Sequence, residues 1–234
     1  ININDKFIGK SFLKQNYWGL QDIDVISKII EFKCKKENKI VFYDVGANIG
    51  THSIALSNIF KNKINIRAFE AQSTIYKMFN QSIKINNLNN IKLYHNAVSD
   101  KNDEIIKIDL PDYSKQNNFG GLELFKPFQN SDNANMQKSG IFEEVKTMKL
   151  DIFDEKVDFI KIDVEGMENL VLKGSKKLIF NHRPFLFLEL FKSNLKEITE
   201  FFKDKDYNVY LKGMDAFIVP FELKVNFKGL KKLL

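Results

Sequence analysis

Five carboxylates follow predicted strands, and they are the residues of this chain best suited to chemistry. Apolar runs at 40–45, 64–69, 157–162 and 185–190 each lead into acidic residues at their carboxyl ends. These acids are Asp44, Glu70, Asp163, Glu165 and Glu189. Because the carboxyl ends of parallel strands meet at one edge of a sheet, we expect these side chains to share one crevice. One acid at a strand end arises easily by chance, whereas acids after four strands predict a site.

The stretch 44–50, Asp-Val-Gly-Ala-Asn-Ile-Gly, predicts the turn that opens a nucleotide-binding βαβ unit. Glycine has no Cβ, so Gly46 and Gly50 allow the backbone to approach a ligand closely, and Ala47 between them is also small. We therefore expect this turn to contact a cofactor.

The details of the turn favour S-adenosylmethionine over NAD as that cofactor. A dinucleotide fingerprint would have glycine at 46, 48 and 51, but this chain has Asn48 and Thr51. Asp44 would repel a pyrophosphate, whereas it would attract the ammonium and sulfonium groups of S-adenosylmethionine. A NAD-linked oxidoreductase is the competing interpretation.

Two further strand ends have residues suited to the rest of such a cofactor. Glu70 lies about 20 residues beyond the glycines, where a carboxylate can accept two hydrogen bonds from a ribose diol. Asn96, Ala97 and Val98 follow the predicted strand 91–95 and suit the edge and face of an adenine.

Proton removal is the remaining task if a hydroxyl is to be methylated, and it needs a base within hydrogen-bond reach. Asp163, with Glu165 or Glu189 beside it, is the first candidate, and His52 in the first turn after Gly50 is the second. The clustered carboxylates could also hold a divalent cation, although we assign no residue as a metal ligand. The alternative is that Asp163 and Glu165 only cap the helix that follows them.

Composition is that of a soluble globular protein. The 234 residues are 44% hydrophobic and 28% charged, with a net charge of +6. Lysines and acids are interspersed, so we expect a solvated surface and no nucleic-acid partner. The single cysteine, Cys34, excludes an internal disulfide and fits a reducing, cytoplasmic location. No apolar run is long enough for a transmembrane segment, and the missing initiator methionine suggests a domain excised from a longer protein.

Predicted strands alternate with helices at 50–61, 73–87, 167–179 and 194–204, and a hairpin closes the chain at 206–223. This order predicts an α/β fold with a doubly wound, mostly parallel sheet and one antiparallel edge strand. Segments 104–109 and 141–149 predict an inserted strand pair around a long polar excursion, 111–140, which we interpret as a substrate loop. We expect one domain over 40–234, preceded by a helical extension or cap over 1–39.

Four motifs resemble those of FkbM-type methyltransferases. They are 44–50, Phe69-Glu70-Ala71, 96–100 (Asn-Ala-Val-Ser-Asp) and 161–168 (Lys-Ile-Asp-Val-Glu-Gly-Met-Glu). The resemblance covers roughly 40–220, and 161–168 is its most specific part. One departure is that Ala71-Gln72 follow Glu70, where the family often has proline.

The resemblance implies a seven-stranded, Rossmann-like class I methyltransferase fold with S-adenosylmethionine as donor. It implies O-methylation of a hydroxyl, with sugars of glycans or polysaccharides as common acceptors and other glycan-synthesis domains as partners. It assigns Asp44, Gly46, Asn48 and Gly50 to the methionine part of the donor, Glu70 to the ribose, and 96–98 to the adenine.

Three alternatives remain beside this interpretation. One is a natural-product O-methyltransferase that acts on polyketides, and another is a catalytically silent, methyltransferase-like binding module. A nucleic-acid methyltransferase is disfavoured, because the signature Asn-Pro-Pro-Tyr is absent where Lys161-Ile-Asp-Val-Glu stands.

Overall fold

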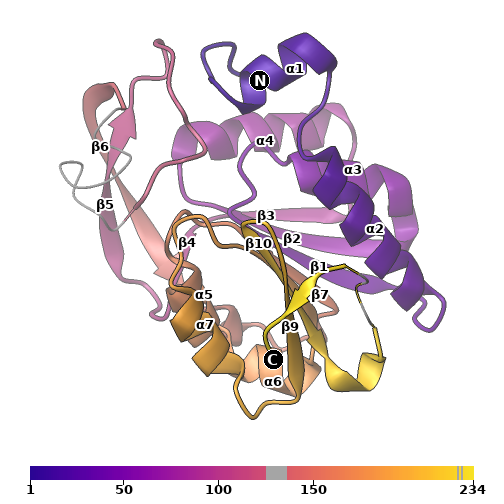
Figure 1. Cartoon of the computed structure of the whole chain (residues 1–234). Helices are drawn as coiled ribbons and strands as arrows, with labels where there is room; N and C mark the ends of the chain where they lie inside the picture. The colour runs from indigo at the N-terminus through magenta and orange to yellow at the C-terminus, as the bar shows by residue number, and fades with distance from the viewer. Residues whose placement is uncertain (125–135, 226, 228) are drawn as a thin grey trace.

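The structure, a computed structural model, describes residues 1–124, 136–225, 227 and 229–234. Its centre is an eight-stranded sheet in the order β11-β9-β10-β8-β7-β1-β2-β3 (Figure 1). The five strands from β8 to β3 are parallel, so their carboxyl ends meet at one edge. The strands are β1 (Ile40–Val45), β2 (Ile64–Glu70), β3 (Ile91–His95), β7 (Phe159–Ile162), β8 (Phe185–Glu189), β9 (Tyr207–Lys212), β10 (Asp215–Pro220) and β11 (Lys231–Lys232).

The predicted mostly parallel α/β sheet is confirmed, with two corrections. The sheet has eight strands rather than seven, because β11 pairs with β9 at the edge. The antiparallel strand predicted for the edge is instead internal, since β10 lies between β8 and β9 and pairs antiparallel with both. The physical reason is burial: residues 216–220 of β10 are all buried, whereas β9, which lies next to the edge strand β11, ends in half-exposed residues.

Helices cover both faces of the sheet (Figure 1). One apolar core joins α2, α3 and α4 to one face, and a second joins α5, α6 and α7 to the other. Neighbouring strand residues serve opposite faces, as Phe42 and Tyr43 do on β1. The helices are α1 (Ile8–Gln15), α2 (Leu20–Cys34), α3 (Thr51–Phe60), α4 (Ser73–Ile85), α5 (Glu168–Gly174), α6 (Lys176–His182) and α7 (Leu195–Phe202), with short 3-10 turns at Lys61–Lys63, Leu150–Ile152 and Phe221–Leu223. Within the described ranges, no helix has the length and apolar character needed to cross a membrane.

The predicted helix 167–179 is two helices, because the chain turns where it packs against a neighbouring loop. A Cβ on Gly174 would lie 1.9 Å from the carbonyl oxygen of Ser99, so this contact requires glycine. The next residue, Ser175, donates its hydroxyl to the carbonyl of Val171 at 2.6 Å and ends α5 there.

The inserted strand pair is present as β5 (Ile105–Pro111) and β6 (Lys138–Met148), which are antiparallel. A third, short strand, β4 (Ala97–Val98), pairs with β6 and completes a separate three-stranded sheet. Within the excursion 111–140 that we interpret as a substrate loop, residues 125–135 lie outside the described residues.

The N-terminal segment pairs with the start of that excursion. Asp5 forms an isolated parallel bridge with Asn117, and the backbone N–H of Lys6 donates to the Asn117 carbonyl at 2.9 Å. The side-chain amide of Asn2 donates to the carbonyl of Tyr113 at 2.9 Å. These contacts hold residues 2–6 beside the edge of the sheet at which the predicted site lies.

Candidate active site

A cavity of about 670 Å³ opens at the carboxyl ends of β1, β2, β7 and β8. Its volume lies in the range typical of small-molecule and cofactor sites. The sheet contributes Gly46, Glu70, Asp163 and Glu189 to its lining, and the N-terminal segment and residues 117–124 contribute further walls.

The glycine turn after β1 is pinned in place by backbone contacts. Gly46 has φ +74°, and a Cβ there would lie 1.8 Å from the carbonyl oxygen of Asp163, so only glycine fits. The backbone N–H groups of Gly46 and Ala47 both donate to the Phe69 carbonyl, at 3.1 and 2.9 Å. The turn therefore joins the ends of three strands and lines the cavity with backbone.

Glu70 is buried at the end of β2 and held by two backbone hydrogen bonds. Its Oε2 accepts from the N–H of Asn48 at 2.9 Å, and its Oε1 accepts from the N–H of Gln72 at 2.8 Å. Burial raises the pKa of Glu70 to about 7, although these hydrogen bonds act in the opposite direction. Each carboxylate oxygen has a second acceptor site, so Glu70 can still accept hydrogen bonds from a ligand.

Lys161 lies beneath the cavity and joins two of the acids. Its Nζ is 3.4 Å from Asp44 Oδ1 and 3.3 Å from Asp163 Oδ2, and its side chain is 3% exposed. Burial opposes the charge on Lys161, but the two carboxylates outweigh burial and raise its pKa. Asp44 also accepts a hydrogen bond of 2.6 Å from the Ser53 hydroxyl.

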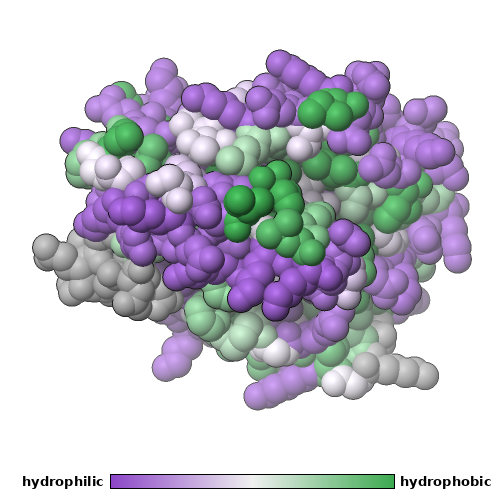
Figure 2. Space-filling view, turned by 90° about the horizontal axis from the view of Figure 1, so that it is seen from above, coloured by the Kyte–Doolittle hydropathy of each residue, from purple (hydrophilic) through white to green (hydrophobic). Residues whose placement is uncertain are grey.

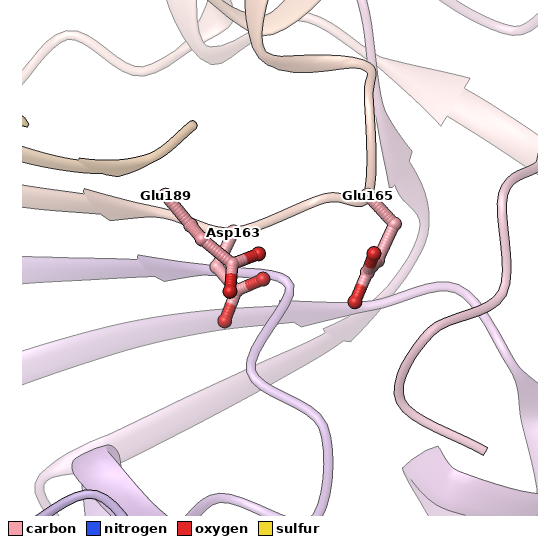
Figure 3. Close-up of side chains that lie close together, drawn as sticks. All are labelled: Asp163, Glu165 and Glu189. Carbon is pink, nitrogen blue, oxygen red and sulfur yellow. The ribbon is translucent and has the colours of Figure 1, made fainter. Parts of the chain in front are cut away.

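Three carboxylates converge above this lysine. Figure 3 shows Asp163 and Glu189 side by side, with Glu165 reaching toward them from the loop after β7. One oxygen of each lies within 4.8 Å of the others.

Burial and neighbouring charges separate the pKa values of Asp163 and Glu189. Burial, together with repulsion from Asp163 and Glu165, raises the pKa of Glu189 to about 9. Burial also acts to raise the pKa of Asp163, but the charge of Lys161 and the hydrogen bond from Glu189 outweigh it and lower that pKa. At neutral pH, Glu189 therefore keeps its proton and donates it to an ionised Asp163.

Glu165 occupies a turn fixed by other charged residues. It has φ +53°, and Glu168 holds the turn by accepting from the N–H groups of Val164 and Gly166, at 3.0 and 3.1 Å. The ammonium group of Lys192 lies 2.9 Å from Glu165 and also donates to the Gly121 carbonyl at 3.0 Å. Burial raises the pKa of Glu165 to about 7, against the effect of Lys192.

The three carboxylates are close enough to hold a divalent cation. Ammonium groups already contact two of them, however, Lys161 at Asp163 and Lys192 at Glu165. A divalent cation would therefore compete with the positive charges of Lys161 and Lys192. In this structure the ion pairs with these lysines hold Asp163 and Glu165 in place.

His52 lies on α3 with its ring against Gly19. It is 8% exposed, and its Nε2 has no hydrogen-bond partner among the described residues. Burial lowers the pKa of His52 to about 4, and the nearby charge of Lys161 acts in the same direction. The imidazole is therefore neutral at physiological pH.

Most of the predicted site residues line this one cavity, and two do not. Asp44 is fully buried behind the turn, where it binds Ser53 and Lys161. Gly50 faces α4, since a Cβ there would lie 2.1 Å from the Phe79 ring. The predicted residues that line the cavity are Gly46, Ala47, Asn48, His52, Glu70, Ala71, Asn96, Ala97, Val98, Asp163, Glu165 and Glu189.

Two lysines of the site, Lys161 and Lys192, were not predicted from the sequence as site residues. Lys161 interrupts an apolar strand, and a charge in a strand buried on both faces signals a partner nearby. Its partner Asp44 is its direct neighbour in the β1–β7 register. Lys192 follows β8 without any such signal, because its partners Glu123 and Glu165 come from distant loops.

Comparison with known proteins identifies the family. The methyltransferase FkbM domain family matches residues 44–209. The chain is similar to the crystal structure of methyltransferase FkbM from Methylobacillus flagellatus KT, with a TM-score of 0.54 and 18% identity. That match covers 78% of this chain and 43% of the Methylobacillus chain, so this chain spans less than half the length of its relative.

Two other solved structures are similar at lower TM-scores. One is a precorrin-6y C5,15-methyltransferase from Geobacter metallireducens GS-15, with a TM-score of 0.44, 14% identity and coverage of 88% of this chain and 89% of that one. The other is an rRNA methylase from Streptococcus thermophilus, with a TM-score of 0.45, 9% identity and coverage of 85% and 91%. No curated protein matches the sequence.

The family match extends from Asp44, behind the glycine turn, to Val209 in β9, and so includes the four parallel strand ends that bear the acids. The α/β fold of this chain is also similar to that of the Methylobacillus structure. The chain therefore belongs to the FkbM methyltransferase domain family, whose class I fold uses S-adenosylmethionine as cofactor.

Proposed function

We propose that this chain transfers a methyl group from S-adenosylmethionine to a hydroxyl group of a sugar in a glycan or polysaccharide. The observation that carries the proposal is the cluster of Asp163, Glu165 and Glu189 in the same cavity as the glycine turn, with the Lys161 ammonium 3.3 Å from Asp163. When bound, S-adenosylmethionine supplies an already activated methyl group. The protein then has to bind and orient the acceptor and take up one proton.

The residues at the ends of β1 and β2 fit this donor. Gly46 exposes backbone to the cavity because no Cβ fits there. Glu70 retains acceptor capacity for the two hydroxyls of a ribose. Ala97 and Val98 add buried apolar surface suited to the face of an adenine. We therefore propose these residues as the donor site.

Asp163 is the proposed general base. The charge of Lys161 keeps the Asp163 carboxylate ionised. The Asp163 side chain is 34% exposed, so an acceptor can reach it. The acceptor's O–H proton would pass to Asp163 as its oxygen takes the methyl group, whose bond to sulfur breaks to leave S-adenosylhomocysteine. Glu189, hydrogen-bonded to Asp163, orients that carboxylate.

A sugar suits the acceptor side of the cavity because this side offers several hydrogen-bond acceptors. Asp163 and Glu165 line it with carboxylate oxygens. A polyhydroxylated ring presents matching O–H donors around its edge. The FkbM family resemblance points to the same class of acceptor.

The test is methyl transfer from labelled S-adenosylmethionine to a panel of methyl glycosides by the wild-type chain and by Asp163→Asn. We expect wild-type transfer to at least one glycoside and a fall of about 100-fold or more in kcat for the variant, the scale of a lost general base. Calorimetry should give the variant an unchanged affinity for S-adenosylhomocysteine.

The control variant is Asp24→Asn, an exposed acid on α2, which should transfer methyl groups at the wild-type rate. Undiminished transfer by Asp163→Asn would remove Asp163 from the role of base. Binding of NAD in place of S-adenosylhomocysteine would contradict the proposed function as a whole.

A further inference from the structure

Three aromatic side chains line the mouth of the cavity. They are Phe7, Trp18 and Phe191. Phe7 is 52% exposed, Phe191 is 61% exposed, and Trp18 is half-buried. Among the described residues, none of the three makes a ring–ring contact, whereas Phe69, deeper in the same cavity, packs on three other rings.

The three rings come from three segments that are each anchored to the rest of the site. The backbone next to Phe7 is tied to Asn117, and Gly19, next to Trp18, packs on the ring of His52. Phe191 lies two residues beyond Glu189 and precedes Lys192, whose ammonium binds Glu165 and Gly121. The positions of the rings relative to the acids are therefore fixed by the fold.

The exposure of these rings is unfavourable unless a ligand covers them. Burying a phenylalanine side chain is favourable, and Phe7 and Phe191 forgo much of that stabilisation in the free protein because more than half of each is exposed. Figure 2 shows hydrophobic residues gathered near the middle of the face seen from above, with hydrophilic residues around them. An apolar group within a polar rim is typical of a binding surface.

We propose that Phe7, Trp18 and Phe191 form the acceptor subsite and stack on the apolar face of a pyranose ring. This inference rests on the proposed function and adds the residues that select the acceptor. A pyranose has an apolar C–H face and hydroxyls around its edge, so it can cover aromatic rings while an edge hydroxyl reaches Asp163. The indole N–H of Trp18 makes no hydrogen bond within the described ranges and can donate to a ring hydroxyl.

Trp18 also provides a direct readout, because it is the single tryptophan of the chain. Titration with methyl glycosides, in the presence of saturating S-adenosylhomocysteine, should change the intrinsic tryptophan fluorescence. Sorbitol, a polyol without a ring, should leave the fluorescence unchanged. Phe191→Ala keeps the reporter, and we expect it to raise the apparent Kd for the glycoside about tenfold, equivalent to about 1.4 kcal/mol.

Phe142→Ala is the matched control, since Phe142 is 54% exposed on β6 and does not line the cavity. It should bind the glycoside as the wild type does, and all variants should bind S-adenosylhomocysteine equally. The inference would be overturned if no methyl glycoside changed the Trp18 fluorescence. An unchanged glycoside affinity in Phe191→Ala would also overturn it.

These outcomes are distinct from failure of the proposed function. If glycosides are methylated but Phe191→Ala has the wild-type KM, the reaction stands and the aromatic subsite is wrong. If S-adenosylhomocysteine does not bind to the wild type, the proposed function itself fails.

Discussion

At the scale of single residues, the site depends on an arrangement of charges that keeps one carboxyl ionised beside another that keeps its proton. Lys161 stabilises the ionised form of Asp163 from below, and Glu189 donates a hydrogen bond to it from the side. Among the described residues Glu189 forms no ion pair, and the charge of Lys161 only partly offsets its burial. Glu189 is therefore the member of the pair whose titration should affect stability in the neutral to alkaline range.

Replacing Glu189 with glutamine should weaken the pH dependence of stability. In the folded chain the pKa of Glu189 is raised to about 9 from an ordinary 4.5, so between about pH 5 and 9 the native state binds a proton that the unfolded state has released. The free energy of unfolding then falls as pH rises through this window. The glutamine of Glu189→Gln cannot ionise. The free energy of unfolding of this variant, relative to that of the wild type, should therefore rise from pH 6 to pH 9.

Thermal unfolding at the two pH values measures this difference. In a chain of this size each kcal/mol of stability moves Tm by roughly 2–4 °C. Glu200→Gln, which alters an exposed acid on α7, is the control and should follow the wild type at both pH values. Parallel curves for wild type and Glu189→Gln would show that Glu189 ionises normally in the folded state.

At the scale of elements, the turn after β1 brings the ends of separate strands together. Gly46 contacts the carbonyl of Asp163 on one side and donates to the carbonyl of Phe69 on the other. These contacts join β1, β2 and the loop after β7. A small displacement of Gly46 should therefore move both the proposed donor site and the proposed base, Asp163.

Gly46→Ala should reduce both stability and donor binding, while Gly213→Ala should affect stability alone. Both glycines have positive φ, +74° and +61°, so alanine at either position costs about 1–2 kcal/mol in backbone strain. A Cβ at Gly46 would also lie 1.8 Å from a backbone oxygen, whereas a Cβ at Gly213 meets nothing within 4 Å. Calorimetry with S-adenosylhomocysteine should give a loss of about 100-fold for Gly46→Ala, the effect of moving site atoms by about 1 Å. Equal affinity in the two variants would contradict a tight turn at the donor.

At the scale of the whole molecule, a buried ion pair ties the N-terminal helices to the sheet. Lys33 of α2 lies 2.9 Å from Asp158, which precedes β7, and the two residues are 9% and 1% exposed. Asp158 also accepts from the backbone N–H of Val41 at 2.9 Å.

Lys33→Met should destabilise the chain by about 3 kcal/mol, because it leaves Asp158 buried with weaker compensation. The value lies at the low end for broken buried pairs, since Lys156 approaches Asp158 at 3.8 Å. Lys28→Met removes an exposed pair on the same helix, with Asp24, and should cost less than about 1 kcal/mol. Urea unfolding of both variants measures the difference, and equal losses would contradict a structural role for the buried pair.

Much of the fold and part of the site followed from local sequence patterns. The predicted ranges of the five parallel strands agree with the observed ones within two residues. The central strands β1, β7 and β8 are largely apolar because they are buried on both faces. The acids at strand ends share one cavity, because parallel topology brings carboxyl ends together whatever the loops do. The eighth strand, a two-residue edge segment, has no such pattern.

The sequence by itself determined the parallel sheet, the glycine turn and the acids that surround the cavity, since each depends on neighbours within a few residues. Only the tertiary structure decided that Asp44 and Gly50 do not line the cavity. It also decided that Lys161 and Lys192 form ion pairs with the acids. It likewise decided that Phe7, Trp18 and Phe191 line the same cavity. The physical reason is distance along the chain: these contacts join residues that come together only when strands, helices and loops pack, and short-range patterns do not encode them.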